Sequence, residues 1–213
     1  MEAEGTETAR QPDPDRELVE AAAGGDEEAF HALVRRHERR LFNFIRISTG
    51  GDAESEDLAQ DVFIRAFRSL DRFRGGSSFK TWLFAIATNV VRTHLSRRPR
   101  WQVLRTMWSG RGRERDEDAD EAPEPAARDG DLEQAIVQRD TIDRALASLA
   151  PDLRLVVTLR DVEGLDYREI AAALGVPIGT VESRLFRARQ RLRPLLEPLL
   201  ARTADRTRGR SEA

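Results

Sequence analysis

Arginine, aromatic and small polar side chains near the C-terminus recur at a spacing suited to reading DNA bases. On a helix that begins at Ile178, with about 100° between successive residues, Ser183, Phe186 and Arg187 fall on one side. The opposite side is a narrow apolar stripe, made of Val181, Leu185, Ala188 and Leu192. Because arginine bonds guanine or phosphate and an aromatic ring can contact a thymine methyl group, the pattern predicts major-groove recognition. The alternative is that Phe186 packs on a neighbouring domain and the arginines only solubilise the surface.

A second segment, residues 79–97, combines aromatic, basic and amide groups. Its predicted inward stripe is Phe79, Leu83, Ile86 and Val90, flanked by Trp82. Its predicted outward face carries Lys80, Thr81, Phe84, Thr88 and Arg92, with Asn89 at one flank. Interleaved aromatic and basic side chains suit single-stranded DNA, whose bases can stack or enter pockets. The alternative is that Trp82 and Phe84 are core residues, and for Trp82 this is the preferred interpretation.

Residues 54–70 predict a helix with an unusual outer face. One half is apolar, formed by Leu58, Val62, Phe63, Ala66, Phe67 and Leu70. The other half places Ile64 among polar residues, namely Asp57, Gln60, Asp61 and Arg68. An apolar centre with a charged rim is typical of a protein interface, whereas a single exposed isoleucine is also common on ordinary surfaces. From the residues alone, both interpretations stay open.

Composition excludes several classes of function. The 213 residues include no cysteine, so a disulfide scaffold, a Cys-ligated zinc site and thiol catalysis are excluded. The three histidines, His31, His37 and His94, lack partners at metal-ligand spacing. We therefore expect no catalytic residue, no metal and no cofactor. Without an apolar run of about 18 residues or a basic-then-apolar leader, we expect a soluble, cytoplasmic protein.

Charge is divided into blocks along the chain, although the total is only −3. Residues 62–115 carry 13 basic and 2 acidic groups, and residues 167–213 carry 10 and 5. Acidic blocks cover residues 52–61, with five acidic and no basic groups, and 116–140, with ten and two. Two basic blocks on structured segments are the electrostatic signature of a polyanion binder.

The periodicity predicts an all-α protein with two small helical domains joined by a flexible linker. We expect a disordered tail over 1–14, a first domain over 15–98, a linker over 99–130, a second domain over 131–200 and a disordered tail over 201–213. In the second domain, YREIAAALGVPIGTVESRLFRAR has the form of a helix-turn-helix, with small Ala171 between the helices and Gly175 at the turn. Pro194 and Pro198 are expected to interrupt the final helix after about Arg193.

Three stretches together resemble one family, the bacterial sigma factors of the extracytoplasmic-function (ECF) group. These stretches are SEDLAQDVFIRAF, LDRFRGGSSFKTWLFAIATNVVRTHLSRR and YREIAAALGVPIGTVESRLFRARQRLR. The resemblance implies a non-enzymatic factor that binds core RNA polymerase, recognises promoter minus-ten and minus-thirty-five elements and promotes DNA melting. It also implies three partners: the polymerase, through its β′ clamp helices and β subunit; promoter DNA; and an anti-sigma factor, often held at the membrane. No small-molecule substrate is expected.

The resemblance also assigns residues to each contact. The polymerase-binding set is Asp57, Gln60, Asp61 and Ile64. The minus-ten set is Phe73, Arg74, Ser77, Lys80, Phe84, Thr88, Asn89 and Arg92. The minus-thirty-five set is Thr180, Glu182, Ser183, Arg184, Phe186 and Arg187.

The sequence departs from the family at three positions that bear on DNA contacts. Ala85 and Thr88 stand where the family often has basic residues, and so does Glu182, whose carboxylate could accept a hydrogen bond from cytosine. The alternative function is a helix-turn-helix regulator that never joins polymerase. That reading explains residues 167–193 but leaves the segment from Leu58 to Arg98 unused.

Overall fold

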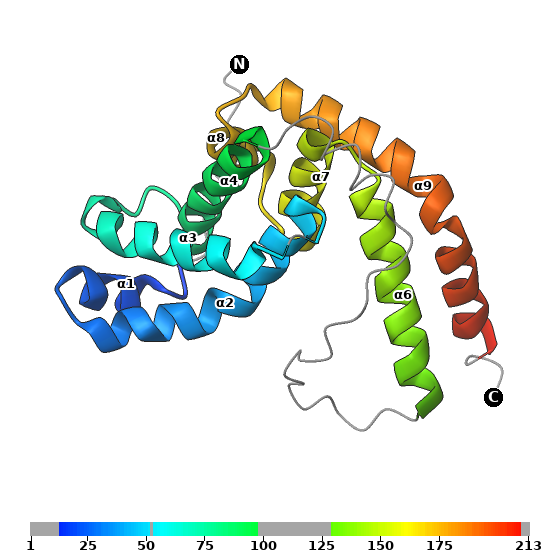
Figure 1. Ribbon diagram of the computed structural model, residues 1–213, viewed down its shortest axis with the longest axis horizontal. Coiled ribbons are helices and arrows are strands. Elements are labelled where there is room, and N and C mark those ends of the chain that lie inside the picture. The colour runs from blue at the N-terminus through cyan, green and yellow to red at the C-terminus, as the bar shows by residue number, and fades with distance from the viewer. Residues whose placement is uncertain (1–12, 52, 98–128, 210–213) are drawn as a thin grey trace, which may run out of the picture.

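A computed structural model describes residues 13–51, 53–97 and 129–209, and every regular element in these ranges is helical (Figure 1). The first part contains α1 (Arg16–Ala23), α2 (Glu27–Thr49), α3 (Ser55–Ser69), the 3-10 turn η1 (Leu70–Arg72) and α4 (Phe79–Arg97). The second contains α6 (Asp129–Ala147), α7 (Pro151–Val157), the π-helical turn η2 (Thr158–Val162), α8 (Tyr167–Leu174) and α9 (Ile178–Gly209). The predicted all-α class is confirmed.

Local sequence signals set several helix ends. The side chain of Asp26 accepts a hydrogen bond from the Ala29 amide and caps the start of α2. Asp166 and Glu169 form a capping box at the start of α8. Gly175 ends α8 with a φ of +64°, the left-handed conformation expected at the turn of the helix-turn-helix.

Each part of the chain contributes a layer of buried apolar side chains. In the first part, α2 is central, and its Phe44 meets Phe84 of α4 edge to face with ring centroids 5.1 Å apart. In the second part, Leu149, Leu159, Leu165 and Ile170 are fully buried around the inward stripe of α9. The two layers join in one continuous cluster, because α4 packs on α8 while α2 packs on α6, α7 and η2 (Figure 1).

The last helix is longer than expected. α9 continues through Pro194 and Pro198 to Gly209, so an end near Arg193 is wrong, as is a disordered tail over 201–209. Each proline lacks the backbone N–H and therefore removes one hydrogen bond from the helix, but its φ is compatible with helical geometry. Leu192 and Leu196 pack against the core on either side of Pro194, and this packing offsets the lost bond.

Other expectations fall partly outside the described residues. Of the predicted linker over 99–130, only residues 129 and 130 are described, and they begin α6. Of the predicted N-terminal tail over 1–14, only Asp13 and Pro14 are described. Within the described ranges, no helix is long and apolar enough to cross a membrane.

Candidate nucleic-acid and protein interfaces

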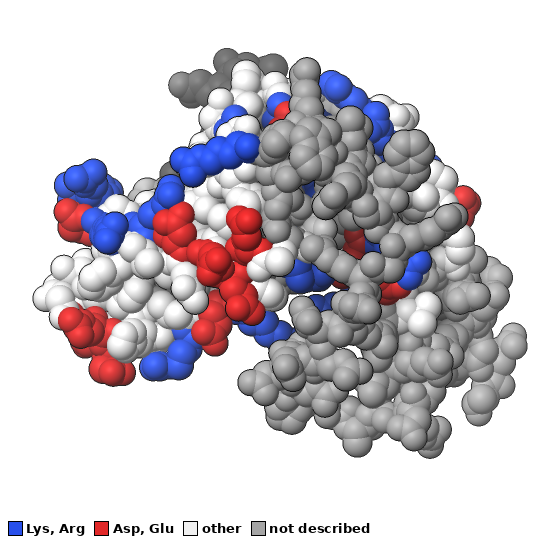
Figure 2. Space-filling view, viewed as in Figure 1, with Lys and Arg blue, Asp and Glu red and all other residues white. Residues whose placement is uncertain are grey.

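The outer face of α3 presents an apolar patch beside acidic groups. Ile64 is 49% exposed, as its place on the helix predicts, while Asp57 and Gln60 are exposed beside it. Asp61 is partly buried and accepts hydrogen bonds from Arg65, with its Oδ1 2.9 Å from Arg65 Nε. Figure 2 shows acidic side chains gathered over the region where α3 lies in Figure 1.

Phe67 extends this patch, which contradicts its predicted inward position. Its side chain is 52% exposed although its ring contacts that of Phe30 edge to face at 4.9 Å. The periodicity already contained a signal, because Phe67 lies three residues after Ile64 and so beside it on the helix surface. The patch of Ile64 and Phe67 is a surface that a partner protein can cover.

The loop before α4 places an aromatic pair beside exposed polar groups. Phe73 is half-buried, and its ring lies 5.2 Å from that of Trp82. Trp82 packs against the core, which confirms the preferred interpretation of this residue. Arg74 and Asn89 are exposed, and Ser77 donates a hydrogen bond to the Ser78 carbonyl. The aromatic pair and its polar surroundings could hold an unstacked base.

The predicted outward face of α4 is covered only in part, since Thr81, Phe84 and Thr88 are buried whereas Arg92 is exposed. Phe84 and Thr88 are both 0% exposed; the ring of Phe84 packs on Phe44 of α2, and α8 packs on α4 from the second domain. Lys80 Nζ donates to the Glu163 carbonyl at 2.8 Å, and Arg92 donates to the Leu174 carbonyl at 2.9 Å. The outward prediction is therefore wrong for Phe84 and Thr88, because the wheel of one helix contains neither α2, on which Phe84 packs within its own domain, nor α8 of the second domain.

Burial shifts the ionisation of two groups at this contact. Desolvation lowers the pKa of Lys80, and the nearby Arg40 charge lowers it further. Desolvation also raises the pKa of the Glu163 carboxyl, while the attraction of Arg40 and Lys80 opposes that rise. Both charged forms thus lose hydration when the two parts of the chain meet.

The second helix of the helix-turn-helix matches the predicted faces. Val181, Leu185, Ala188 and Leu192 are buried. Phe186 is 63% exposed, and Glu182 and Arg187 are exposed beside it.

The remaining minus-thirty-five candidates are engaged within the chain. Ser183 donates to the Thr180 carbonyl at 3.0 Å. Arg184 bonds the carboxylate of Asp152 at 2.9 Å, so the structure directs it toward α7 rather than toward the face of Phe186. These contacts single out Glu182, Phe186 and Arg187 as the groups most available to DNA.

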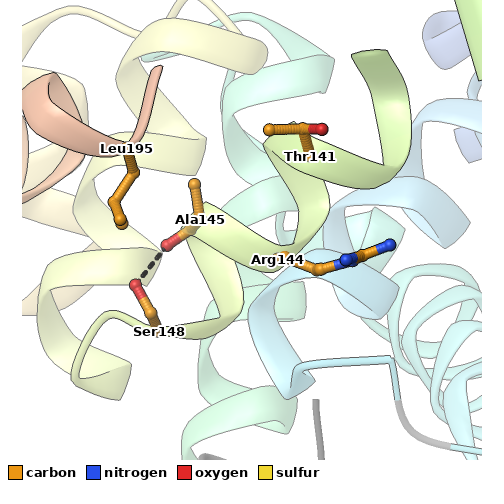
Figure 3. Close-up of a pocket in the computed structure, with 5 residues that line it drawn as sticks. All are labelled: Thr141, Arg144, Ala145, Ser148 and Leu195. Carbon is orange, nitrogen blue, oxygen red and sulfur yellow. Dashed lines mark hydrogen bonds between the residues drawn. The ribbon is translucent and has the colours of Figure 1, made fainter. Parts of the chain in front are cut away.

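A shallow depression between α6 and α9 offers no reactive group. Figure 3 shows its lining, which consists of Thr141, Arg144, Ala145, Ser148 and Leu195. The Ser148 hydroxyl donates to the Ala145 carbonyl at 2.6 Å and is thereby held by its own helix. Among the residues that the structure describes, no three His, Asp or Glu side chains are grouped to hold a metal ion.

Two family models match the two parts of the chain. The model described as Sigma-70 region 2 matches residues 33–100, and the model described as Sigma-70, region 4 matches residues 139–192. The RNA polymerase sigma-H factor of Pseudomonas aeruginosa is 37% identical over 194 residues, covering 87% of this chain and 95% of that protein. The ECF RNA polymerase sigma-E factor of Escherichia coli K12 is 36% identical over 192 residues, covering 88% and 97%.

This chain belongs to the ECF sigma factors.

Solved structures of related proteins agree with the fold. CnrH, solved in complex with the cytosolic domain of CnrY, has a TM-score of 0.59 and 30% identity, and the match covers 86% of this chain and 97% of CnrH. The sigma factor RpoE of Bartonella quintana, solved with the anti-sigma factor NepR, has a TM-score of 0.59 and 29% identity, with coverage of 79% and 96%.

As an ECF sigma factor, the protein binds core RNA polymerase and recognises promoters. The alternative of a regulator that never joins polymerase is not favoured. It leaves the first domain without a role, and that half matches sigma region 2.

Proposed function

We propose that this ECF sigma factor divides its work between two domains, with residues 15–98 binding polymerase and the minus-ten element and residues 131–200 binding the minus-thirty-five element. One observation carries the proposal: α9 buries one apolar stripe and exposes Phe186 and Arg187 on the opposite side, after a turn closed by left-handed Gly175. An aromatic ring exposed beside arginine is costly in water, but it has a use against base edges.

In this proposal α3 docks on the β′ clamp helices of the polymerase. Ile64 supplies the apolar centre, and Asp57, Gln60 and Asp61 supply the polar rim. Phe67 enlarges the centre on the same helix face. The aromatic neighbour strengthens the case for an interface over a stray exposed isoleucine.

The minus-ten element would be captured by α4 and the preceding loop. Phe73 and Trp82 offer an aromatic wall, Arg74 and Ser77 line the loop, and Asn89 presents its amide from α4. Unstacking a base step costs a few kcal/mol, which stacking and hydrogen bonding in the pocket must offset. Lys80, Thr88 and Arg92 complete the proposed set on α4, and Phe84 supports it from the core, where its ring packs on Phe44 of α2.

The minus-thirty-five element would be read by α9. Arg187 suits guanine or phosphate, Phe186 suits a thymine methyl group and Glu182 suits the amino group of cytosine. Thr180 and Ser183 lie at the first turns of the helix, where they can reach the DNA backbone. Arg184 has the weakest claim because Asp152 holds its guanidinium.

The proposed mechanism contains no covalent chemistry, because binding and strand capture account for each named side chain. We further propose that the protein acts in the cytoplasm, where its polymerase lies, and that an anti-sigma protein binds it. The structural relative RpoE was solved with the anti-sigma factor NepR, and CnrH was solved with the cytosolic domain of CnrY.

Run-off transcription with core polymerase on a randomised promoter library tests the proposal. The intact protein should yield transcripts from promoters that share two short motifs, and omitting it should abolish them. The failure of folded protein to yield any promoter-specific product would overturn the proposed function. Promoter binding without association with core polymerase would instead favour the regulator.

A further inference from the structure

The segment Asp13–Asp15, just before α1, is bonded to the first turn of α4. Oδ2 of Asp13 accepts a hydrogen bond from the backbone amide of Phe79 at 2.6 Å, across 66 positions of the sequence. Phe79 is the first residue of α4, and the first four amides of a helix have no acceptor within that helix. The Ser78 hydroxyl accepts from one of them, the amide of Thr81, at 3.1 Å. Asp13 accepts from another, and its carboxylate suits the positive end of the helix dipole.

The same segment is anchored on α2 by a buried carboxylate. Asp15 is 1% exposed; its Oδ1 accepts from Arg36, and its Oδ2 lies 2.7 Å from Nε2 of the buried His37. Arg36 also donates to the Pro14 carbonyl at 3.1 Å, and the Asp15 amide donates to Oδ1 of Asp13 at 3.1 Å. Each of the two carboxylates thus uses both of its oxygens, which fixes the segment between α2 and α4.

The ring of Phe79 forms the base of the proposed aromatic wall. It is 0% exposed, and its centroid lies 6.3 Å from that of Phe73 and 5.8 Å from that of Trp82. The ring of His37 lies 5.5 Å from the same phenyl ring. The N-terminal segment therefore supports the wall twice, once through the amide of Phe79 and once through the imidazole of His37.

The loop over residues 73–78 begins and ends at elements that the N-terminal part of the chain contacts. α1 packs on η1, which precedes the loop, and Asp13 binds the first amide of α4, which follows it. The middle of the loop is open, because a methyl group added at Gly75 or Gly76 would meet nothing within 4 Å. A loop with an open middle depends on its two ends for its position.

We infer that Asp13 is a positioning residue for base capture, because its bond to the Phe79 amide fixes the first turn of α4 and with it the aromatic wall. The inference rests on the proposed function, since it takes the loop over residues 73–78 and α4 as the minus-ten pocket. Asp13 lies outside the minus-ten set, and it acts through Phe79 without contacting DNA. Removing a carboxylate should by charge alone favour DNA binding, whereas loss of positioning should weaken capture, so the sign of the effect separates the two.

The test uses three variants of the full chain. Asp13→Ala removes the acceptor, whereas Asp13→Asn removes only the charge and keeps an oxygen for the Phe79 amide, since asparagine caps helices about as well as aspartate. Asp71→Ala is the matched control, because Asp71 is exposed in η1 at the other end of the loop and undergoes the same loss of charge. Circular dichroism checks that each variant is folded.

Hydrogen exchange of the free protein, followed by mass spectrometry, measures protection of the Phe79 amide. Asp13→Ala should speed this exchange about two- to thirtyfold, the range that corresponds to losing a helix cap. Asp13→Asn and Asp71→Ala should stay within about twofold of the unmodified protein. The amides of α9 are the internal reference, because a global loss of stability would speed their exchange as well. Equal exchange at Phe79 in all four proteins would overturn the role of Asp13 in fixing α4.

The second measurement is capture of single-stranded DNA by the holoenzyme. Core polymerase, alone or with each protein, retains strands from a pool of random sequence, and the retained strands are sequenced. The motif that the unmodified protein enriches over core polymerase alone should be enriched about three- to tenfold less by Asp13→Ala. Asp71→Ala should enrich it equally or more, because it removes a negative charge without moving the wall.

The outcomes separate this inference from the proposed function. If the unmodified holoenzyme enriched no motif, capture of the minus-ten element would itself be overturned. An enriched motif that Asp13→Ala leaves unchanged would overturn only the positioning role, even if exchange at Phe79 were faster. Affinity for core polymerase without DNA should be the same for all four proteins, since the proposed polymerase contact lies on α3.

Discussion

Ile64 and Phe67 are large apolar side chains that α3 leaves about half exposed. At the scale of single residues, such exposure beside Asp57 and Asp61 is a feature of the surface that folding does not require. The same holds for Phe186 on α9. Substitutions at these positions should therefore change binding while leaving the free energy of unfolding nearly unchanged.

Replacing Ile64 with aspartate should weaken assembly with core polymerase at least tenfold, because it puts a charge at the centre of an apolar contact. Binding can be measured by fluorescence anisotropy with labelled sigma factor and no DNA. Ile178→Asp is the matched control, since Ile178 is similarly exposed, at the start of α9. Unchanged polymerase affinity in Ile64→Asp would remove α3 from the interface.

Replacing Arg187 with alanine should cost about 1–3 kcal/mol of promoter affinity if its guanidinium reads a base, with relaxed preference at one position of the minus-thirty-five element. Holoenzyme binding to a set of single-base promoter variants measures both effects. A uniform loss across promoters, with a shallower salt dependence, would show instead that Arg187 contacts phosphate.

Helix ends and the side chains that meet them are decisive at the scale of elements. α2 ends at Gly50, whose φ is +82°, and Arg154 reaches this end from α7. A methyl group on Gly50 would lie 2.7 Å from a guanidinium nitrogen of Arg154. The end of α2 thus combines a backbone requirement for glycine with a close contact from the other domain.

Gly50→Ala should lower the free energy of unfolding by more than the roughly 1–2 kcal/mol expected for a left-handed alanine alone, because Arg154 must also move. Urea denaturation measures this loss. Gly25→Ala is the matched control: its φ is +98° and nothing lies within 4 Å of the added methyl group. If both variants lost the same free energy of unfolding, the Arg154 side chain would move away from the added methyl group without an energetic cost.

At the scale of the whole molecule, the ionisation of Glu163 makes the free energy of unfolding depend on pH. Burial raises its pKa above the ordinary value of 4.5 in the folded protein, against the attraction of Arg40 and Lys80. The folded state then binds a proton more tightly than the unfolded state does. The stabilising contribution of this group is accordingly complete below pH 4.5 and is lost as pH rises through the raised pKa.

Glu163→Gln should remove this dependence. The free energy of unfolding of the unmodified protein, minus that of Glu163→Gln, should fall as pH rises from 4.5 toward neutrality. Urea denaturation at a series of pH values gives the difference, with Glu38→Gln on the exposed side of α2 as control. A difference that is flat or rises with pH would contradict the assigned desolvation of Glu163.

Much of the fold follows from local chemistry. The apolar stripe of α9 and the turn at Gly175 each depend on residues within a few positions of one another, and both predictions agree with the structure. The exposures of Ile64 and Phe186 follow from the same periodicity.

The failures have a common cause in contacts between distant segments. Pro194 does not end α9, because Leu192 and Leu196 remain packed against the core. The wheel for α4 placed Phe84 and Thr88 outside, but both are buried, and Phe84 packs on Phe44 of α2, 40 residues away in the sequence. No pattern within a single helix contains the surface that packs on it.

Periodicity, turn residues and motifs are local, and they are sufficient to predict that this protein is helical, that its second half carries a helix-turn-helix and that it resembles ECF sigma factors. Contacts between distant segments, by contrast, are visible in the tertiary structure alone, and there Lys80 and Arg92 of α4 donate hydrogen bonds to backbone carbonyls of the second domain. That outcome depends on whether acceptors from Glu163 to Leu174 stabilise these donors better than water does, a balance set by two segments about 80 residues apart.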